Sequence, residues 1–126
     1  MSFLPAADRE YLESKAVAFE EVQDGGQKAI ILKSILLPSG RFDAPVADIL
    51  IILPPAYPDV APDMFHLMPW VRLVPAGKYP NAADQSVMFN GQNWQRWSRH
   101  NSEWRPGIDG IWTMLKRVED ALARAA

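Results

Sequence analysis

Residues 46–53, which read VADILIIL, restrict the fold most, because apart from Asp48 their side chains are apolar on both faces of an extended chain. Side chains alternate along a strand, so the odd-numbered ones from Ala47 to Leu53 share one face, while Leu50 and Ile52 lie on the other. A strand with two apolar faces has to be covered on both of them. The run Val46–Leu53 therefore predicts a central strand of a sheet.

Neighbouring runs predict the rest of this sheet. Further β-like runs cover Val17–Val22, Ala29–Leu37 and Met64–Val74, the last interrupted near Pro69. Asp24-Gly25-Gly26 is a strong hairpin signal between the first two runs, since glycine tolerates positive φ. Pro38-Ser39-Gly40 marks the next turn. Strands joined by short turns pair antiparallel with their sequence neighbours, so a four-stranded meander is predicted.

Two helices are predicted, one near each end of the chain. Pro5–Lys15 opens with a proline that suits a first helical turn, and Asp8 suits the positive end of the helix dipole. Apolar residues at helical spacing define one face of Ile108–Ala123. Pro75–Pro106 shows little periodicity and is predicted to be a long irregular segment rich in tryptophan. The 126 residues are thus expected to form one α+β domain, residues 1–126.

Three motifs carry a resemblance to a known family. Leu53-Pro54-Pro55-Ala56-Tyr57-Pro58 follows the apolar strand, and Trp97-Ser98-Arg99-His100 and Trp104-Arg105-Pro106-Gly107 precede the last helix. In this order they resemble ubiquitin-conjugating (E2-type) proteins, most closely the branch called prokaryotic E2 family E. The resemblance implies a ubiquitin-conjugating, RWD-like fold over nearly the whole chain. It also implies three partners: a ubiquitin-like protein, an activating-type adenylating enzyme and a JAB-type metalloprotease.

The chain contains no cysteine, although conjugating enzymes carry the acyl group on a cysteine thiolate. The family usually has His-Pro-Asn shortly before that nucleophile, and the nearest match here is Tyr79-Pro80-Asn81. Asn81 is a candidate hydrogen-bond donor to an oxyanion, although the same tripeptide is also typical of a plain turn. Counting onward places Met88, a thioether, in the nucleophile's position. Ser86 is a candidate oxygen nucleophile, provided that a base lies nearby.

The Trp-rich stretch supplies the other candidate site residues. Imidazole is the side chain whose ordinary pKa lies near neutrality, so His100 is a candidate general acid or base, the alternative being a buried structural histidine. Trp94, Arg96, Trp97 and Arg99 are candidates for a partner-binding surface, where Trp and Arg are common anchors. For the tryptophan rings the alternative is core filling. The two histidines lack metal-ligand spacing, so neither a metal nor another cofactor is predicted.

Composition argues against several functional classes. The 13 basic and 15 acidic residues give a net charge of −2, which does not favour nucleic-acid binding. The longest apolar run is too short to cross a bilayer, and the N-terminal residues do not resemble a signal peptide. A cytoplasmic location is therefore expected.

Three functions remain open from the sequence. The first is a non-catalytic binding or scaffold component of a bacterial ubiquitin-like modification system, because the thiol is missing. The second is an enzyme that uses His100 as general acid or base with a nucleophile other than cysteine. The third is a generic RWD-type protein-interaction module with no ubiquitin-like partner.

Overall fold

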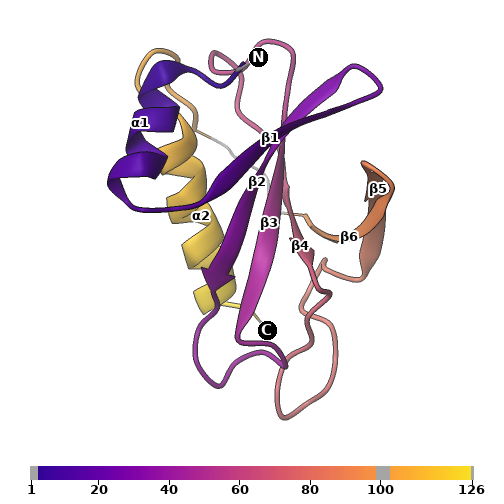
Figure 1. Cartoon of the computed structure of the whole chain (residues 1–126). Helices are drawn as coiled ribbons and strands as arrows, with labels where there is room; N and C mark the ends of the chain where they lie inside the picture. The colour runs from indigo at the N-terminus through magenta and orange to yellow at the C-terminus, as the bar shows by residue number, and fades with distance from the viewer. Residues whose placement is uncertain (1–2, 99–102, 126) are drawn as a thin grey trace.

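The computed structural model describes residues 3–98 and 103–125, and this part of the chain contains two helices and six strands (Figure 1). In chain order they are α1 (Ala6–Ser14), β1 (Phe19–Asp24), β2 (Gln27–Leu36), β3 (Val46–Leu53), β4 (Phe65–Met68), β5 (Gln85–Phe89), β6 (Gln92–Trp97) and α2 (Ile111–Ala123). No helix within the described residues is long and apolar enough to cross a membrane. The predicted α+β class, with a helix at each end of an antiparallel sheet, is confirmed.

The strands form one antiparallel sheet in the order β1-β2-β3-β4-β6-β5. β3 lies between β2 and β4, which confirms the central position predicted for Val46–Leu53. Strands β1 to β4 form the predicted meander. The fourth strand is shorter than Met64–Val74, because β4 ends at Met68 and Pro69 has no N–H with which to continue the ladder.

The segment Pro75–Pro106 contains a hairpin, so the prediction of irregular structure is wrong for residues 85–97. β5 and β6 pair along their length and are joined at Asn90-Gly91. These two residues have φ values of 52° and 77°, as a tight hairpin turn of this kind requires. β6 rather than β5 pairs with β4, so the hairpin extends the sheet to six strands but does not continue the meander.

Both helices cover one face of the sheet (Figure 1). The inward face of α2 consists of Ile111, Met114, Leu115, Val118 and Leu122, all of them buried. α1 adds Leu12, which has no exposed surface. These side chains share a core with Ile49 and Ile51 of β3, as the alternation along that strand predicts.

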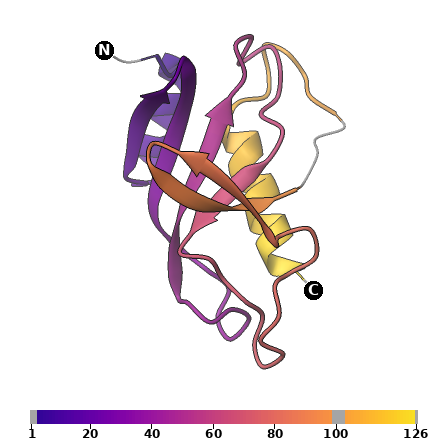
Figure 2. The ribbon, with the colours of Figure 1, turned by 90° about the vertical axis from the view of Figure 1, so that its right-hand side faces the viewer.

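The β5–β6 hairpin curls over the opposite face of the sheet (Figure 2). There Phe89 and Trp94 pack with apolar side chains of β2 and β3, including Leu50. Trp97 points to the helix side and stacks on Phe65, with 5.4 Å between ring centres. Trp94 is 2% exposed and Trp97 is 0% exposed, so both fill the core and present no ring face to a partner.

Candidate functional site

Asn81 lies at an exposed turn on the connection from β4 to β5. The N–H of Ala83 donates to the carbonyl of Pro80 at 3.1 Å, which closes a turn over the two residues between them. Ala82 has a φ of 55°, and Pro80 and Ala83 are buried on either side of the exposed pair. The tripeptide is therefore the plain turn that its composition indicates, and that turn presents Asn81 to solvent.

A buried amide holds this turn in place. Gln95 of β6 is 0% exposed, and its Nε2 donates to the carbonyls of Ala83 at 2.8 Å and Val71 at 3.0 Å. Its Oε1 accepts the N–H of Val71 at 2.9 Å and the indole N–H of Trp97 at 3.3 Å. The backbone N–H of Ser98 also donates to the carbonyl of Ala82 at 3.0 Å. Gln95 was not predicted from the sequence. The available signal was its polar side chain on the same strand face as Trp97.

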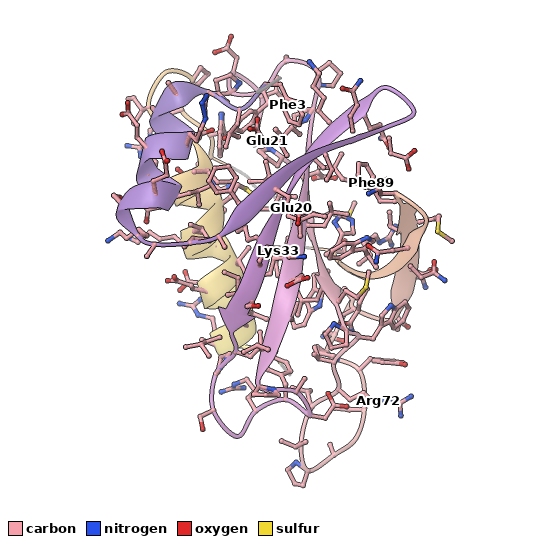
Figure 3. All side chains as sticks on the ribbon, viewed as in Figure 1. Phe3, Glu20, Glu21, Lys33, Arg72 and Phe89 are labelled. Atoms are coloured by element: carbon pink, nitrogen blue, oxygen red, sulfur yellow. The ribbon has the colours of Figure 1, made fainter. Side chains whose placement is uncertain are left out.

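Aromatic and cationic side chains lie just before the turn. The rings of Trp70 and Tyr79 meet edge to face, with centres 5.7 Å apart. The guanidinium of Arg72 lies 4.6 Å from the centre of the Tyr79 ring and donates to its hydroxyl at 3.2 Å. Arg72 itself is exposed, on the loop that leads away from β4 (Figure 3). This cluster stiffens the approach to Asn81 and leaves a cation at the surface.

Ser86 and Met88 lie on β5, the edge strand of the hairpin. Ser86 pairs with Gln95 and Met88 pairs with Asn93, so both side chains share the face from which Gln95 reaches the turn. Ser86 is exposed, and Met88 is 63% exposed. The tip of the hairpin is fixed as well, since the N–H of Asn90 donates to the carboxylate of Asp24 at 2.8 Å. Met88 is thus exposed to solvent on a strand that is held in place at both ends.

The structure describes only some of the remaining candidate residues. His100 and Arg99 lie outside the described residues. Arg96 is half-buried on β6 opposite His66, and its Nε has no hydrogen-bond partner among the residues described. His66 is buried, with Nδ1 3.2 Å from the carbonyl of Leu50, and burial together with the charge of Arg96 lowers its pKa. No group of side chains in the described part of the chain has the make-up of a metal site.

The Tyr57-Pro58 motif holds the start of α2 rather than the Asn81 turn. The hydroxyl of Tyr57 donates to the carboxylate of Asp8, and the other oxygen of Asp8 accepts the N–H of Ile111 at 3.1 Å. Burial and the bond to Asp8 raise the pKa of Tyr57, so its hydroxyl stays protonated and available as a donor. The indole of Trp104 donates to the carbonyl of Pro58 at 2.8 Å. The motifs that contain Tyr57-Pro58 and Trp104-Arg105 therefore meet at a structural junction that holds the start of α2.

Arg105 and Asp109 complete the junction with an ion pair. Their side chains approach to 2.9 Å, and the backbone N–H of Arg105 donates to the same carboxylate at 2.7 Å. The hydroxyl of Thr113 donates to it as well, at 3.0 Å. These bonds, that of the guanidinium foremost, hold the pKa of Asp109 well below its usual range.

The ion pair predicts a pH-dependent effect of Arg105→Ala. The pKa of Asp109 is depressed in the folded state, so its stabilisation is fully present above the unfolded pKa, near 4, and declines as pH falls toward the folded pKa. Thermal midpoints measured by circular dichroism should show a constant gap between the variant and the wild type from about pH 7 to 5. The gap should narrow steadily below about pH 4. A gap that does not change with pH would contradict this role, and Arg124→Ala, at an exposed site, is the control.

Comparison with known proteins gives a family match, which covers the whole of this fold. The family model described as prokaryotic E2 family E matches residues 4–125, which include both helices and all six strands described above. No curated protein matches the chain, and no solved structure does.

Proposed function

The chain belongs to prokaryotic E2 family E, and on that premise we propose that it is a non-catalytic binding component of a bacterial ubiquitin-like modification system. It is a ubiquitin-conjugating-like protein without a cysteine. Thioester transfer needs a thiolate, and a thioether cannot take its place. The scaffold is retained while the chemical group that forms the thioester is missing.

One observation carries the proposal: Met88, which the resemblance puts in the nucleophile's position, is 63% exposed on an anchored strand. An exposed methionine offers a partner an apolar contact, because its flexible thioether side chain adapts well to other protein surfaces. The nearby turn is fixed through Gln95, so the surface is ready to bind without reorganisation. We take Met88, Ser86 and Asn81 to lie within the partner-binding surface.

The partners that family membership supports are a ubiquitin-like protein, an adenylating activating-type enzyme and a JAB-type metalloprotease. All three would meet this chain in the cytoplasm. The family match favours this function over a generic RWD-type interaction module. An enzyme that uses Ser86 as an oxygen nucleophile is the competing candidate, because Ser86 is exposed and pairs with the residue that holds the Asn81 turn.

Titration of the isotope-labelled chain with a ubiquitin-like protein from the same genome tests the proposal. We expect reversible binding, with a dissociation constant on the order of micromolar and amide shifts on the β5–β6 hairpin and the Asn81 turn. Met88→Lys should weaken binding at least about tenfold, because it places a charge in the apolar contact. Val60→Lys is the matched control, since Val60 is 49% exposed on the connection from β3 to β4. Absence of binding, or shifts confined to other surfaces, would contradict the proposal.

A further inference from the structure

A groove of about 950 Å³ lies on the helix side of the sheet, away from the Asn81 turn. It runs between the C-terminal part of β2, the connection from α1 to β1, and the side of α2 that carries Leu115, Glu119 and Leu122. Its apolar lining includes Val17, Ile35, Leu37, Leu115 and Leu122. None of the three motifs that carry the family resemblance lines this groove, so a role for it does not depend on the proposed function.

One wall of the groove is an unpaired strand edge. The register of β1 with β2 ends at Leu32, and the last backbone bond across this edge runs from the N–H of Lys33 to the carbonyl of Ala18 at 2.8 Å, while β2 continues to Leu36 beside β3. The N–H of Leu37 donates to the carbonyl of Pro45, on the β3 side, at 2.9 Å. Backbone groups of successive residues point in opposite directions along a strand. The N–H and C=O of Leu36 therefore point away from β3, toward the side of the groove. Backbone groups of this kind are a template for an additional strand.

A bulge sets the geometry of this edge. The register between β2 and β3 shifts between Leu32 and Ile35, and Ser34 has a φ of 52°. Asp48 holds the bulge, because its carboxylate accepts the N–H of Ser34 at 2.9 Å and lies 3.1 Å from the amino group of Lys33. Beyond the bulge Leu36 is 80% exposed, although it belongs to a strand. The edge thus offers backbone groups together with an exposed apolar side chain.

The charges around the groove are mainly positive. Lys15, Lys33 and Lys116 line it, and Glu119 is the acidic residue among its lining. Asp48 and Glu20 offset the charge of Lys33. The Glu20 carboxylate lies 3.9 Å from the amino group of Lys33 (Figure 3). Lys15 and Lys116 are exposed and flank the apolar floor. Carboxylates on an occupant would complement these two cations.

We propose that this groove binds an extended peptide segment of another protein, which adds as a strand along Ser34–Leu36, inserts apolar side chains toward α2 and places carboxylates beside Lys15 and Lys116. Backbone pairing gives such a complex its affinity, and alternate side chains give it specificity. A helix would leave the backbone groups of Leu36 unpaired. A second copy of this chain, paired through the same edge, would bring like lysines together.

The test uses short synthetic peptides in which valine and threonine alternate between paired aspartates, with a lysine-ended peptide as the charge control. Amide spectra of the labelled protein should show shifts at residues 34–37 with the acidic peptide. Exchange of the Leu36 amide hydrogen should slow at least about tenfold. The lysine-ended peptide should bind much more weakly, because its charges repel Lys15 and Lys116.

Leu36→Pro is the decisive variant, since it removes the one N–H that points toward the groove and leaves the β3 ladder intact. It should abolish binding, whereas Leu36→Thr should retain it. Lys116→Glu should weaken binding roughly two- to fivefold and Lys78→Glu, outside the groove, should have no effect. Failure of the acidic peptide to bind, or equal binding to a folded Leu36→Pro protein, would overturn the proposal. Sedimentation that shows a dimer dissolved by Leu36→Pro would overturn it in favour of a second copy.

Discussion

Replacing Asp8 with alanine is expected to lower the free energy of unfolding by roughly 2–5 kcal/mol. The carboxylate is 6% exposed, and it accepts both the hydroxyl of Tyr57 and the N–H of Ile111 at the start of α2. Gly110, which precedes that helix, has no side chain with which to cap it. Asp8 therefore supplies from α1 the cap that α2 lacks, and alanine would leave the buried N–H of Ile111 and the half-buried hydroxyl of Tyr57 without this partner. Urea unfolding followed by circular dichroism measures the loss.

Gly110 provides the matched test of this junction. A Cβ at position 110 would lie 2.6 Å from the Asp8 carboxylate oxygen, so Gly110→Ala should cost about 1–3 kcal/mol in the wild type. In the Asp8→Ala background the oxygen is gone, and the same change should be nearly neutral. Tyr57→Phe should cost only about 1 kcal/mol, the value of one hydrogen bond. Additive effects of Asp8→Ala and Gly110→Ala would show that Asp8 does not hold this position.

Gln95→Leu is expected to cost roughly 3–5 kcal/mol, because four hydrogen bonds to buried groups disappear at once. Leucine keeps most of the volume but leaves both backbone groups of Val71, the carbonyl of Ala83 and the indole of Trp97 without this partner. The loss should be largest at the Asn81 turn, so hydrogen exchange at Val71 should accelerate more than exchange in β2 and β3.

Gln92→Leu is the control for this effect, since Gln92 lies on the same strand and is exposed. It should change stability by no more than about 0.5 kcal/mol. Gln95→Glu should be at least as harmful as leucine, because it buries a charge and loses the two donated bonds. A Gln95→Leu protein as stable as Gln92→Leu would contradict the role of Gln95 in fixing the turn.

Local patterns in the sequence were sufficient for most of the fold. The period-two apolar run of β3 and the helical spacing of α2 are properties of neighbouring residues, and both elements are confirmed. The β5–β6 hairpin was missed because Gln, Ser and Asn fill many of its positions, and these residues carry little strand propensity. Asn90-Gly91 was the available signal, since that dipeptide favours a tight hairpin turn.

The supports of the site could not be predicted in the same way. The partners of Asp8 lie 49 and 103 residues away in sequence, and Gln95 bonds to Val71 across 24 residues. No pattern among neighbouring residues predicts contacts between residues so far apart in sequence. Asp8 was therefore assigned to the dipole of its own helix, whereas in the structure it is buried and caps α2. The turn at Asn81 did follow from the composition of its tripeptide, whereas the exposure of Met88 was not predicted.

The central claim is that the chain keeps a ubiquitin-conjugating-like scaffold but carries no acyl group. Intact mass measured after incubation with the ubiquitin-like protein, its activating enzyme and ATP tests this directly. The wild-type mass should stay unchanged, while Met88→Cys should gain the mass of the modifier and lose it again on treatment with a thiol. A modifier-sized increase on the wild-type chain that resists thiols and is removed at alkaline pH or by Ser86→Ala would contradict the claim.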